Sequence, residues 1–377
     1  MSFPETRQPT ELAGSRVKVA FGAGVLKELG TIVQGLSASR VLLVSDPGIT
    51  AAGHVERAVR SLYQAGLAVR VFDGVGENPT TEHVSKGLLV ARAFKPDLIV
   101  GLGGGSAMDC GKGINFLLTN GGRVQDYWGV DKASKPMLPF VAVPTTAGTG
   151  SDAQSFALIT DPQTHQKMAC GDAKALPRVA VLDPELTQTA PATVAAAAGI
   201  DAIAHAVETA GTTKRGDISR RLSREAWRLL EGAYERVMRD SSDANARGRM
   251  LMGAHVAGAA IENSMLGAAH AAANALTAAC GTVHGIAVGL MLPKVIRFNA
   301  AVGNNPYSDL MDDAEALARR IEQMLTAGNL PRRLDEVGAT PEMIPELAIT
   351  AAKQWTATFN PRPVAETEFQ QMFAATL

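Results

Sequence analysis

The feature that most constrains the fold is a run of glycines between a short apolar segment and a helical pattern. Residues 97–100 predict a buried strand, the cluster Gly101-Leu102-Gly103-Gly104-Gly105-Ser106 follows at once, and a helix is expected to begin near residues 107–109. Such a strand–glycine–helix junction can bind phosphate, because backbone N–H groups and the positive helix end face an anion. A tight strand–helix turn is the alternative, but four glycines in five residues are more than a turn requires. We predict a pyrophosphate site that matches neither the GxGxxG nor the P-loop pattern.

The first half of the chain alternates between strand and helix patterns. Strands are expected at residues 16–22, 40–45, 67–72, 97–100, 140–143, 153–160 and 180–182, and helices at residues 25–36, 50–64 and 82–94. This order predicts an α/β fold with a buried parallel sheet.

After strand 140–143 comes a hydroxyl-rich segment, Pro144-Thr145-Thr146-Ala147-Gly148-Thr149-Gly150-Ser151-Asp152. It would suit a ribose, phosphate or carboxamide, and an ordinary solvent loop is an equal alternative.

From about residue 187 the pattern changes to helical spacing. Helices are expected at residues 191–210, 218–238, 244–263, 268–279, 285–298, 309–324 and 341–355, with a short terminal helix after the extended segment Asn360-Pro361-Arg362-Pro363. The second half is therefore predicted to be all-helical. We place the domains at residues 1–188 and 189–377.

Composition limits the class of partner. The 377 residues carry 36 basic and 37 acidic side chains, so nothing favours a nucleic-acid or membrane-surface partner. The start of the chain is polar, so no signal peptide is expected, and the longest apolar runs are interrupted by charge, so no transmembrane helix is expected. Three cysteines without CxxC spacing fit a reducing cytoplasm and argue against a cysteine zinc site.

One carboxylate and three imidazoles stand in nearly apolar surroundings in the second half. Asp201 and His205 are spaced i, i+4 and would share one helical face, and His270 and His284 follow in Ala- and Gly-rich segments. A single histidine in such a helix is more often a satisfied core residue. The joint pattern favours a divalent metal site with nitrogen and oxygen ligands.

Taken together, these residues resemble the iron-containing (group III) alcohol dehydrogenases of the dehydroquinate synthase-like superfamily. The resemblance covers essentially the whole chain, and its motifs are specific as a set. They are Phe21-Gly22-Ala23-Gly24, Gly103–Ser106, Pro144–Ser151, Asp183-Pro184-Glu185-Leu186, Gly199–His205, the interval from His270 to His284, and Asn360–Pro363. The resemblance implies an α/β dinucleotide-binding domain, an all-helical metal-binding and catalytic domain, an active site in the cleft between them, and a homodimer or higher homo-oligomer.

The resemblance also implies roles for single residues. Metal ligation falls on Asp201, His205, His270 and His284, and pyrophosphate binding on Gly103, Gly104, Gly105 and Ser106. Further cofactor contacts fall on Thr145, Thr146 and Thr149. Asp46, at the end of the second strand, takes the position that distinguishes NAD from NADP, because a carboxylate there accepts bonds from ribose hydroxyls and repels a 2′-phosphate. From the sequence alone, without the resemblance, Asp46 would be interpreted as a simple helix cap.

The chain departs from the family pattern at two positions. Many members carry a second histidine four residues after the third ligand, where this chain has Asn274, an amide that cannot shuttle a proton near neutral pH. Asn274 therefore either replaces a proton relay or binds substrate. Asp152 stands where glutamate is common, which suggests a loop suited to a different substrate.

The expected activity is an NAD(H)-linked, metal-dependent interconversion of an alcohol with an aldehyde or ketone. Fe²⁺ is the expected metal, and the ligands would also accept Zn²⁺. The alternatives are a dehydroquinate synthase-like lyase or cyclase, and a glycerol dehydrogenase-like polyol oxidoreductase that uses zinc. A catalytically idle nucleotide-binding protein is a third possibility, which the complete ligand set opposes. The sequence does not reveal the substrate.

Overall fold

The computed structural model describes residues 5–164, 166–303 and 305–377. The first four residues of the polar N-terminal segment lie outside these ranges. The chain divides into two compact units, Met1–Thr189 and Ala190–Leu377. No helix in the described ranges is both long enough and apolar enough to cross a membrane.

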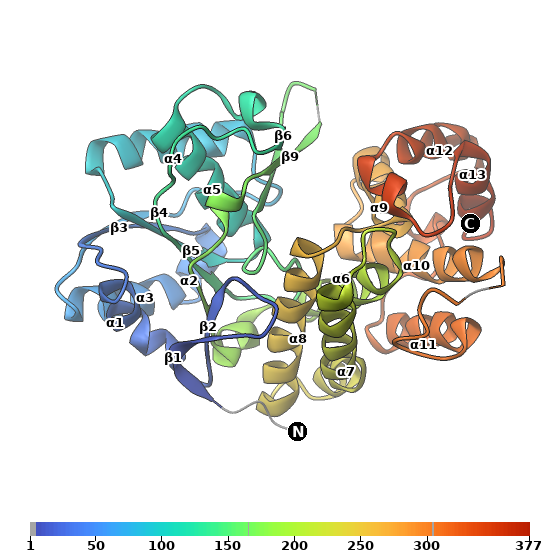
Figure 1. The fold of residues 1–377 in the computed structure, drawn as a ribbon, viewed down its shortest axis with the longest axis horizontal. Coiled ribbons are helices and arrows are strands. Elements are labelled where there is room, and N and C mark those ends of the chain that lie inside the picture. Colours follow the sequence, from blue (N-terminus) through green and yellow to red (C-terminus); the bar gives the residue numbers. More distant parts are fainter. Residues whose placement is uncertain (1–4, 165, 304) are drawn as a thin grey trace. The chain divides into compact units, whose positions relative to one another are not determined.

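The first unit is built on a seven-stranded sheet with the order β1-β2-β10-β7-β5-β3-β4. Figure 1 labels β1, β2, β3, β4 and β5 of this sheet. The edge strand β1 is antiparallel to β2, and all other pairs are parallel. The central strands are buried on both faces, which explains their continuous apolar sequence. The strands are β1 (Thr6–Glu11), β2 (Lys18–Phe21), β3 (Arg40–Val44), β4 (Ala68–Phe72), β5 (Leu98–Gly103), β7 (Phe140–Pro144) and β10 (Val179–Leu182).

Helices cover both faces of this sheet. On one face, α1 (Leu29–Gln34) and α3 (His54–Gln64) join the core that contains Leu43. On the other face, α4 (Thr81–Phe94) and α5 (Gly105–Asn120) join the core that contains Leu42. Because Leu42 and Leu43 are successive residues of β3, their side chains point to opposite faces. The short helix α2 (Pro47–Ala51) follows β3.

The order of the strands reverses between β3 and β5. The chain passes from β3 through α3 to β4 on one side, then returns through α4 to β5 on the other side of β3. In open α/β sheets, ligands bind outside the carboxyl ends of the strands at such a reversal. The segments that follow β3, β5 and β7 all leave the sheet at this edge, because these strands are parallel.

A second, smaller sheet completes the first unit. Its order is β6-β9-β8, formed by β6 (Gly129–Val130), β8 (Phe156–Thr160) and β9 (Lys167–Gly171). Strands β8 and β9 form an antiparallel hairpin with continuous register from Phe156↔Gly171 to Thr160↔Lys167. Helix α5 packs against β8 and thereby connects the two sheets.

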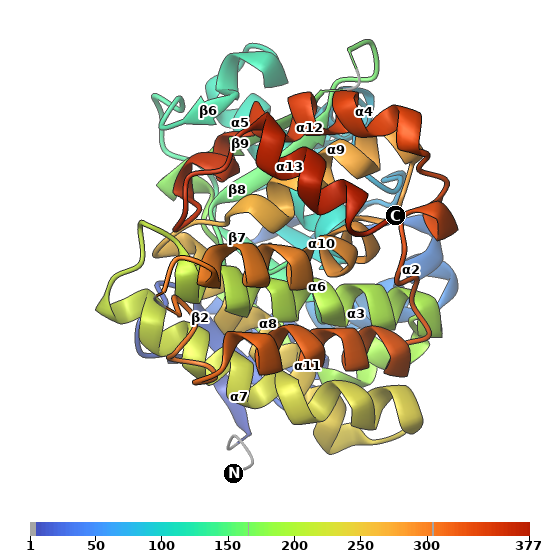
Figure 2. The same cartoon turned by 90° about the vertical axis from the view of Figure 1, so that its right-hand side faces the viewer.

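The second unit consists of helices packed around α6. This helix contacts α7, α8 and α10, and α9 packs against α10 and α12 (Figures 1 and 2). The α6 residues from Gly199 to Gly211 are all buried, in keeping with their Ala-rich sequence. The helices are α6 (Ala192–Gly211), α7 (Asp217–Arg239), α8 (Ala244–Glu262), α9 (Ala268–Cys280), α10 (His284–Ala300), α11 (Ala314–Ala327), α12 (Ile344–Ala352) and α13 (Glu366–Ala374).

An α/β unit followed by a helical unit confirms the predicted fold class, with several local corrections. The helix expected at residues 50–64 is interrupted by Gly53, whose φ of 79° separates α2 from α3. Strand β5 continues through the glycine cluster to Gly103, and α5 begins at Gly105 rather than near residue 107. The helix expected from residue 309 begins only at Ala314, where the Asp313 side chain caps it. Strands β1, β6 and β9 were not expected from the sequence.

Candidate active site

Helix α6 contributes the first two residues of the predicted metal site. Asp201 and His205 are both 4% exposed, and they lie one turn apart on the same face of the helix. The His205 Nε2 atom lies 3.5 Å from the Asp201 Oδ1 atom. A carboxylate and an imidazole are thus held together in the interior of the second unit.

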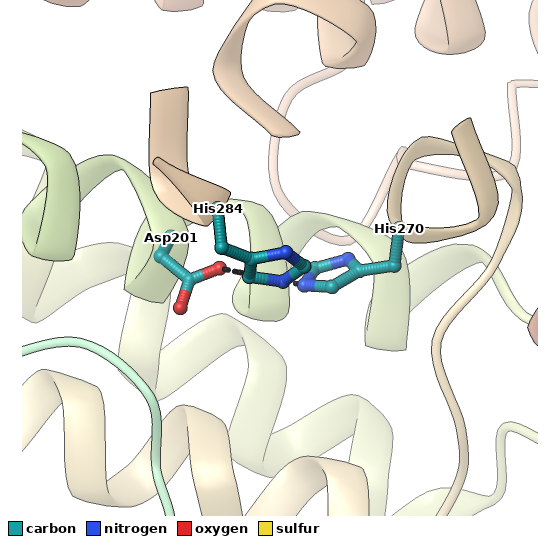
Figure 3. Close-up of side chains that lie close together, drawn as sticks. All are labelled: Asp201, His270 and His284. Carbon is teal, nitrogen blue, oxygen red and sulfur yellow. Dashed lines mark ion pairs between the residues drawn. The ribbon is translucent and has the colours of Figure 1, made fainter. Parts of the chain in front are cut away.

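Two other helix starts contribute the remaining imidazoles. His270 lies in the first turn of α9, and His284 is the first residue of α10. Their Nε2 atoms lie 3.4 Å and 3.9 Å from the same Asp201 Oδ1 atom. Figure 3 shows the two imidazoles and the Asp201 carboxylate pointing toward one another. The His205 and His270 rings stack with their centroids 4.9 Å apart. The ligand atoms of Asp201, His270 and His284 thus lie within 4.8 Å of one another, and His205 lies beside this group on α6.

The spacing of these atoms fits a common metal ion. Ligands bound at ~2.1 Å in a tetrahedral arrangement lie about 3.4 Å apart, close to the separations found around Asp201 Oδ1. Asp201 Oδ1 and His270 Nε2 are both buried and have no hydrogen-bond partner among the described residues. Buried polar atoms without partners are costly, and a shared cation would satisfy both. Asp201, His270 and His284 thus fit a divalent metal with one oxygen and two nitrogen donors, and His205, 3.5 Å from Asp201 Oδ1, is the candidate for a third nitrogen donor.

Glu208, which the sequence analysis did not single out, supports this cluster. It lies on α6 two turns after Asp201 and is 3% exposed. Its Oε2 atom lies 2.5 Å from His270 Nδ1, and its Oε1 atom accepts a 2.7 Å hydrogen bond from the Ala269 N–H. A carboxylate on Nδ1 makes that nitrogen the donor and leaves Nε2 as the atom that faces Asp201.

The electrostatics of the cluster favour positive charge at its centre. Burial raises the pKa of Asp201, but the neighbouring His205, His270 and His284 imidazoles outweigh burial and hold this pKa below its usual range. Burial lowers the pKa of His270, but Glu208 and Asp201 outweigh it and raise this pKa to about 9. Two buried carboxylates therefore surround the imidazoles with negative charge that a cation can neutralise.

The motif Asn360–Pro363 also reaches this region. Asn360 Oδ1 accepts a bond from the Ala268 N–H at the start of α9, and its side chain exchanges two bonds with Asn299. Arg362 stacks over the Phe298 ring at 3.9 Å and donates to the Phe298 carbonyl. These contacts hold the N-terminal end of α9, which carries His270. The motif Asn360–Pro363 therefore has a structural role in positioning His270.

Asn274 lies one turn after His270 on α9. Its Nδ2 atom donates a 3.2 Å hydrogen bond to Oε1 of Gln354, which follows α12. One N–H of the Asn274 amide is therefore already hydrogen-bonded to the Gln354 side chain. Its role as a relay replacement or as a substrate contact stays a prediction.

The predicted cofactor residues of the first unit gather at the carboxyl edge of the sheet. Gly103 has a φ of 148°, and a Cβ atom there would lie 2.8 Å from Ala107 Cβ and 3.2 Å from Asp46 Oδ2. The other oxygen of Asp46, Oδ1, accepts a 3.0 Å bond from the Ile49 N–H and caps α2. Asp46 is therefore a helix cap, and its Oδ2 atom faces the glycine cluster.

The hydroxyl-rich segment lies against the same cluster. The Thr145 N–H donates to the Gly103 carbonyl at 2.9 Å, and a Cβ atom on Gly105 would come within 2.8 Å of Thr149 Oγ1. Ser106 Oγ accepts a 3.2 Å bond from the Asn78 N–H. A Cβ atom on Gly104 would lie 3.6 Å from Thr146 Oγ1. The segments after β3, β5 and β7 thus meet around the first turn of α5, whose N–H groups lack intrahelical partners.

Comparison with known proteins identifies the family. The profile of iron-containing alcohol dehydrogenases matches residues 17–184, and the profile of the C-terminal part of the Fe-containing alcohol dehydrogenase family matches residues 195–377. Alcohol dehydrogenase 4 of Schizosaccharomyces pombe is 34% identical over 366 residues, which cover 95% of this chain and 87% of that protein.

Solved structures agree with this match. A 1,3-propanediol oxidoreductase superposes with a TM-score of 0.92 and 32% identity over 95% of this chain and 97% of that one. Sulfoacetaldehyde reductase from Bifidobacterium kashiwanohense, solved in complex with NAD⁺, gives a TM-score of 0.87 and 25% identity over 96% of this chain and 98% of that one. The chain belongs to the family of iron-containing alcohol dehydrogenases.

Proposed function

We propose that the protein is a metal-dependent, NAD(H)-linked oxidoreductase that interconverts an alcohol with an aldehyde or ketone. The observation that carries the proposal is the convergence of three histidine Nε2 atoms on one Asp201 oxygen, at 3.4 to 3.9 Å. Membership of the family agrees with this reading of the cluster. None of these observations favours the dehydroquinate synthase-like alternative.

Asp201, His205, His270 and His284 would hold the metal. Their donors are nitrogen and oxygen, a set that suits Fe²⁺ and also accepts Zn²⁺. The family description supports iron. Glu208 would fix the His270 ring so that its Nε2 atom stays directed at Asp201.

Gly103, Gly104, Gly105 and Ser106 would bind the pyrophosphate of the cofactor at the start of α5. Thr145, Thr146 and Thr149 would contribute further contacts from the neighbouring segment. Asp46 would accept hydrogen bonds from the ribose hydroxyls through Oδ2 and repel a 2′-phosphate, which favours NAD(H) over NADP(H). The NAD⁺ complex of the sulfoacetaldehyde reductase supports the choice of cofactor class.

When bound, the metal supplies a Lewis acid for the substrate oxygen, and the nicotinamide supplies the site that gains or loses the hydride. The chain's own residues bind and orient these groups. The almost complete burial of Asp201, His205 and His270 excludes water around their ligand atoms, which strengthens electrostatic interactions there. Asn274, one turn from His270, would contact the substrate or take the place of a proton relay.

The direct test is a substrate screen. The purified protein, loaded with Fe²⁺ under anaerobic conditions or with Zn²⁺, is supplied with NAD⁺ and short alcohols or diols, and with NADH and the matching aldehydes. We expect net formation of NADH from an alcohol and net consumption of NADH with an aldehyde. Turnover of a substrate with no net change in NADH would instead indicate a lyase or cyclase that recycles its cofactor.

We also propose a cytoplasmic location and a homo-oligomeric state. Cys110, Cys170 and Cys280 are all free thiols, which is compatible with a reducing compartment. The oligomeric state rests on the family resemblance alone. Light scattering coupled to gel filtration would measure it, and a monomeric mass at micromolar concentration would overturn it.

A further inference from the structure

Helix α5 carries a buried lysine that the proposed chemistry does not use. The Lys112 side chain is fully buried, and its Nζ atom donates to the carbonyls of Ser151, Gln154 and Phe156 at 2.7, 2.8 and 2.9 Å. It also donates to Ser151 Oγ at 3.0 Å. A buried ammonium is stable only when its donors are satisfied, and these carbonyls provide that satisfaction.

A carboxylate on the same helix completes the network. Asp109 lies one turn before Lys112, and its Oδ1 atom accepts a 2.5 Å bond from Ser151 Oγ. Its Oδ2 atom accepts a 3.1 Å bond from the Leu158 N–H. Burial raises the pKa of Asp109 above its usual value, and Lys112 and the bond from Ser151 offset this rise only in part. Ser151 is therefore held from both sides by two side chains of α5, the Lys112 ammonium and the Asp109 carboxyl group.

The segment held in this way continues directly from the proposed cofactor contacts. Residues 145–150 (Thr-Thr-Ala-Gly-Thr-Gly) have small side chains, and two of them are glycines. Such a segment loses much conformational entropy when it is ordered and has little side-chain packing of its own to offset the loss. Its one end is bonded to Gly103 through Thr145, and its other end is bonded to α5 through Ser151.

We propose that Lys112 and Asp109 are positioning residues for the cofactor, which hold the segment 145–151 in its binding conformation against the first turn of α5. This inference rests on the proposed NAD(H) function. The same helix then serves two purposes. Its N-terminus faces the pyrophosphate, and its second turn fixes the hydroxyl-bearing segment that lies against Gly105. A single rigid element thereby sets the distance between two halves of the cofactor site.

Weakening of the network should appear as weaker cofactor binding. Apparent affinity falls in proportion to the fraction of molecules in the binding-competent conformation. One lost hydrogen bond of ordinary strength, ~1 kcal/mol, corresponds to about a fivefold rise in the dissociation constant for NADH. We therefore expect about fivefold for Ser151→Ala and roughly tenfold or more for Lys112→Gln, which leaves several carbonyls without a charged donor.

The test compares these two variants with a matched control, Ser61→Ala. Ser61 is also a buried serine of the first unit, and its Oγ atom bridges the Gly30 N–H and the Lys27 carbonyl. It contacts none of the proposed cofactor residues. Each full-length, metal-loaded protein is measured for NADH affinity by fluorescence titration, for KM and kcat with NAD⁺, for melting temperature and for metal content.

The proposal expects weaker NADH binding and a higher KM for NAD⁺ in Ser151→Ala and Lys112→Gln, with kcat at saturating NAD⁺ and metal content close to the parent. Ser61→Ala should lose stability but keep parental NADH affinity. If Lys112→Gln does not fold, Ser151→Ala decides alone. Parental NADH affinity in Ser151→Ala, or an equal loss in Ser61→Ala, overturns the positioning role. A parent protein that does not bind NADH overturns the proposed function and this inference with it.

Discussion

Glu208→Gln is the substitution that most sharply separates a metal centre from a buried polar cluster. The parental carboxylate accepts from two donors, the His270 Nδ1 atom at 2.5 Å and the Ala269 N–H at 2.7 Å. A glutamine keeps the size of the side chain but has one acceptor oxygen and an NH₂ group. Its NH₂ group must face one of the two donors, so one contact is lost or the His270 ring must turn or change tautomer.

The size of the effect follows from the bond that is lost. A hydrogen bond to a charged group contributes ~1.5 to 3 kcal/mol, which corresponds to about a 10- to 150-fold change in an equilibrium constant. Substitution of a residue that orients a metal ligand generally costs about 10- to 100-fold in metal affinity. Both estimates agree, so we expect the affinity of Glu208→Gln for Fe²⁺ or Zn²⁺ to fall by one to two orders of magnitude.

The assay is competition with a chelator of known affinity, measured on the parent, Glu208→Gln and a control, Glu235→Gln. Glu235 lies on α7 in the same unit and pairs with Arg320 of α11. The control should keep parental metal affinity. Parental affinity in Glu208→Gln, with His270 in the same tautomer by NMR, would refute the reasoning that Glu208 orients a metal ligand.

Two further predictions concern the cofactor and the substrate. Asp46→Ser should keep the cap of α2, because serine also caps helices, and it removes the charge that opposes a 2′-phosphate. The ratio of kcat/KM for NADP⁺ to kcat/KM for NAD⁺ should therefore rise. An unchanged ratio would leave Asp46 as a helix cap only. Asn274→His should shift the pH profile of kcat, because an imidazole one turn from His270 can carry a proton near neutral pH. A higher KM with an unchanged profile would instead assign Asn274 to substrate binding, as its contact with Gln354 permits, and no change in either would remove it from the site.

The fold was predictable from the sequence where local pattern and tertiary packing agree. The apolar strands β3, β5 and β7 are buried on both faces, so their hydrophobic runs reveal them directly. Strand β1 has the sequence TRQPTE and is only partly buried, so it carries no such signal. The break between α2 and α3 depends on the left-handed conformation of Gly53, which an apolar pattern does not show.

The cluster of candidate metal ligands was predictable for a different reason. Asp201 and His205 share a helical face, and imidazoles in Ala-rich helices are unusual enough to attract attention. Glu208 gave no comparable signal, because a glutamate on a helix is usually solvated and its partner His270 is 62 residues away. Asp109 and Lys112 were equally hidden, since their partners lie on a segment about 40 residues later that only the packing of α5 against β8 brings close.

The central claim is that Asp201, His205, His270 and His284 bind a metal that turnover requires. The most direct measurement compares metal content and alcohol-dependent NADH formation in the parent and in His270→Ala. We predict that the parent holds one divalent ion per chain and forms NADH, whereas His270→Ala, folded by circular dichroism, retains neither the ion nor the activity. Full metal content together with full activity in His270→Ala would contradict the account.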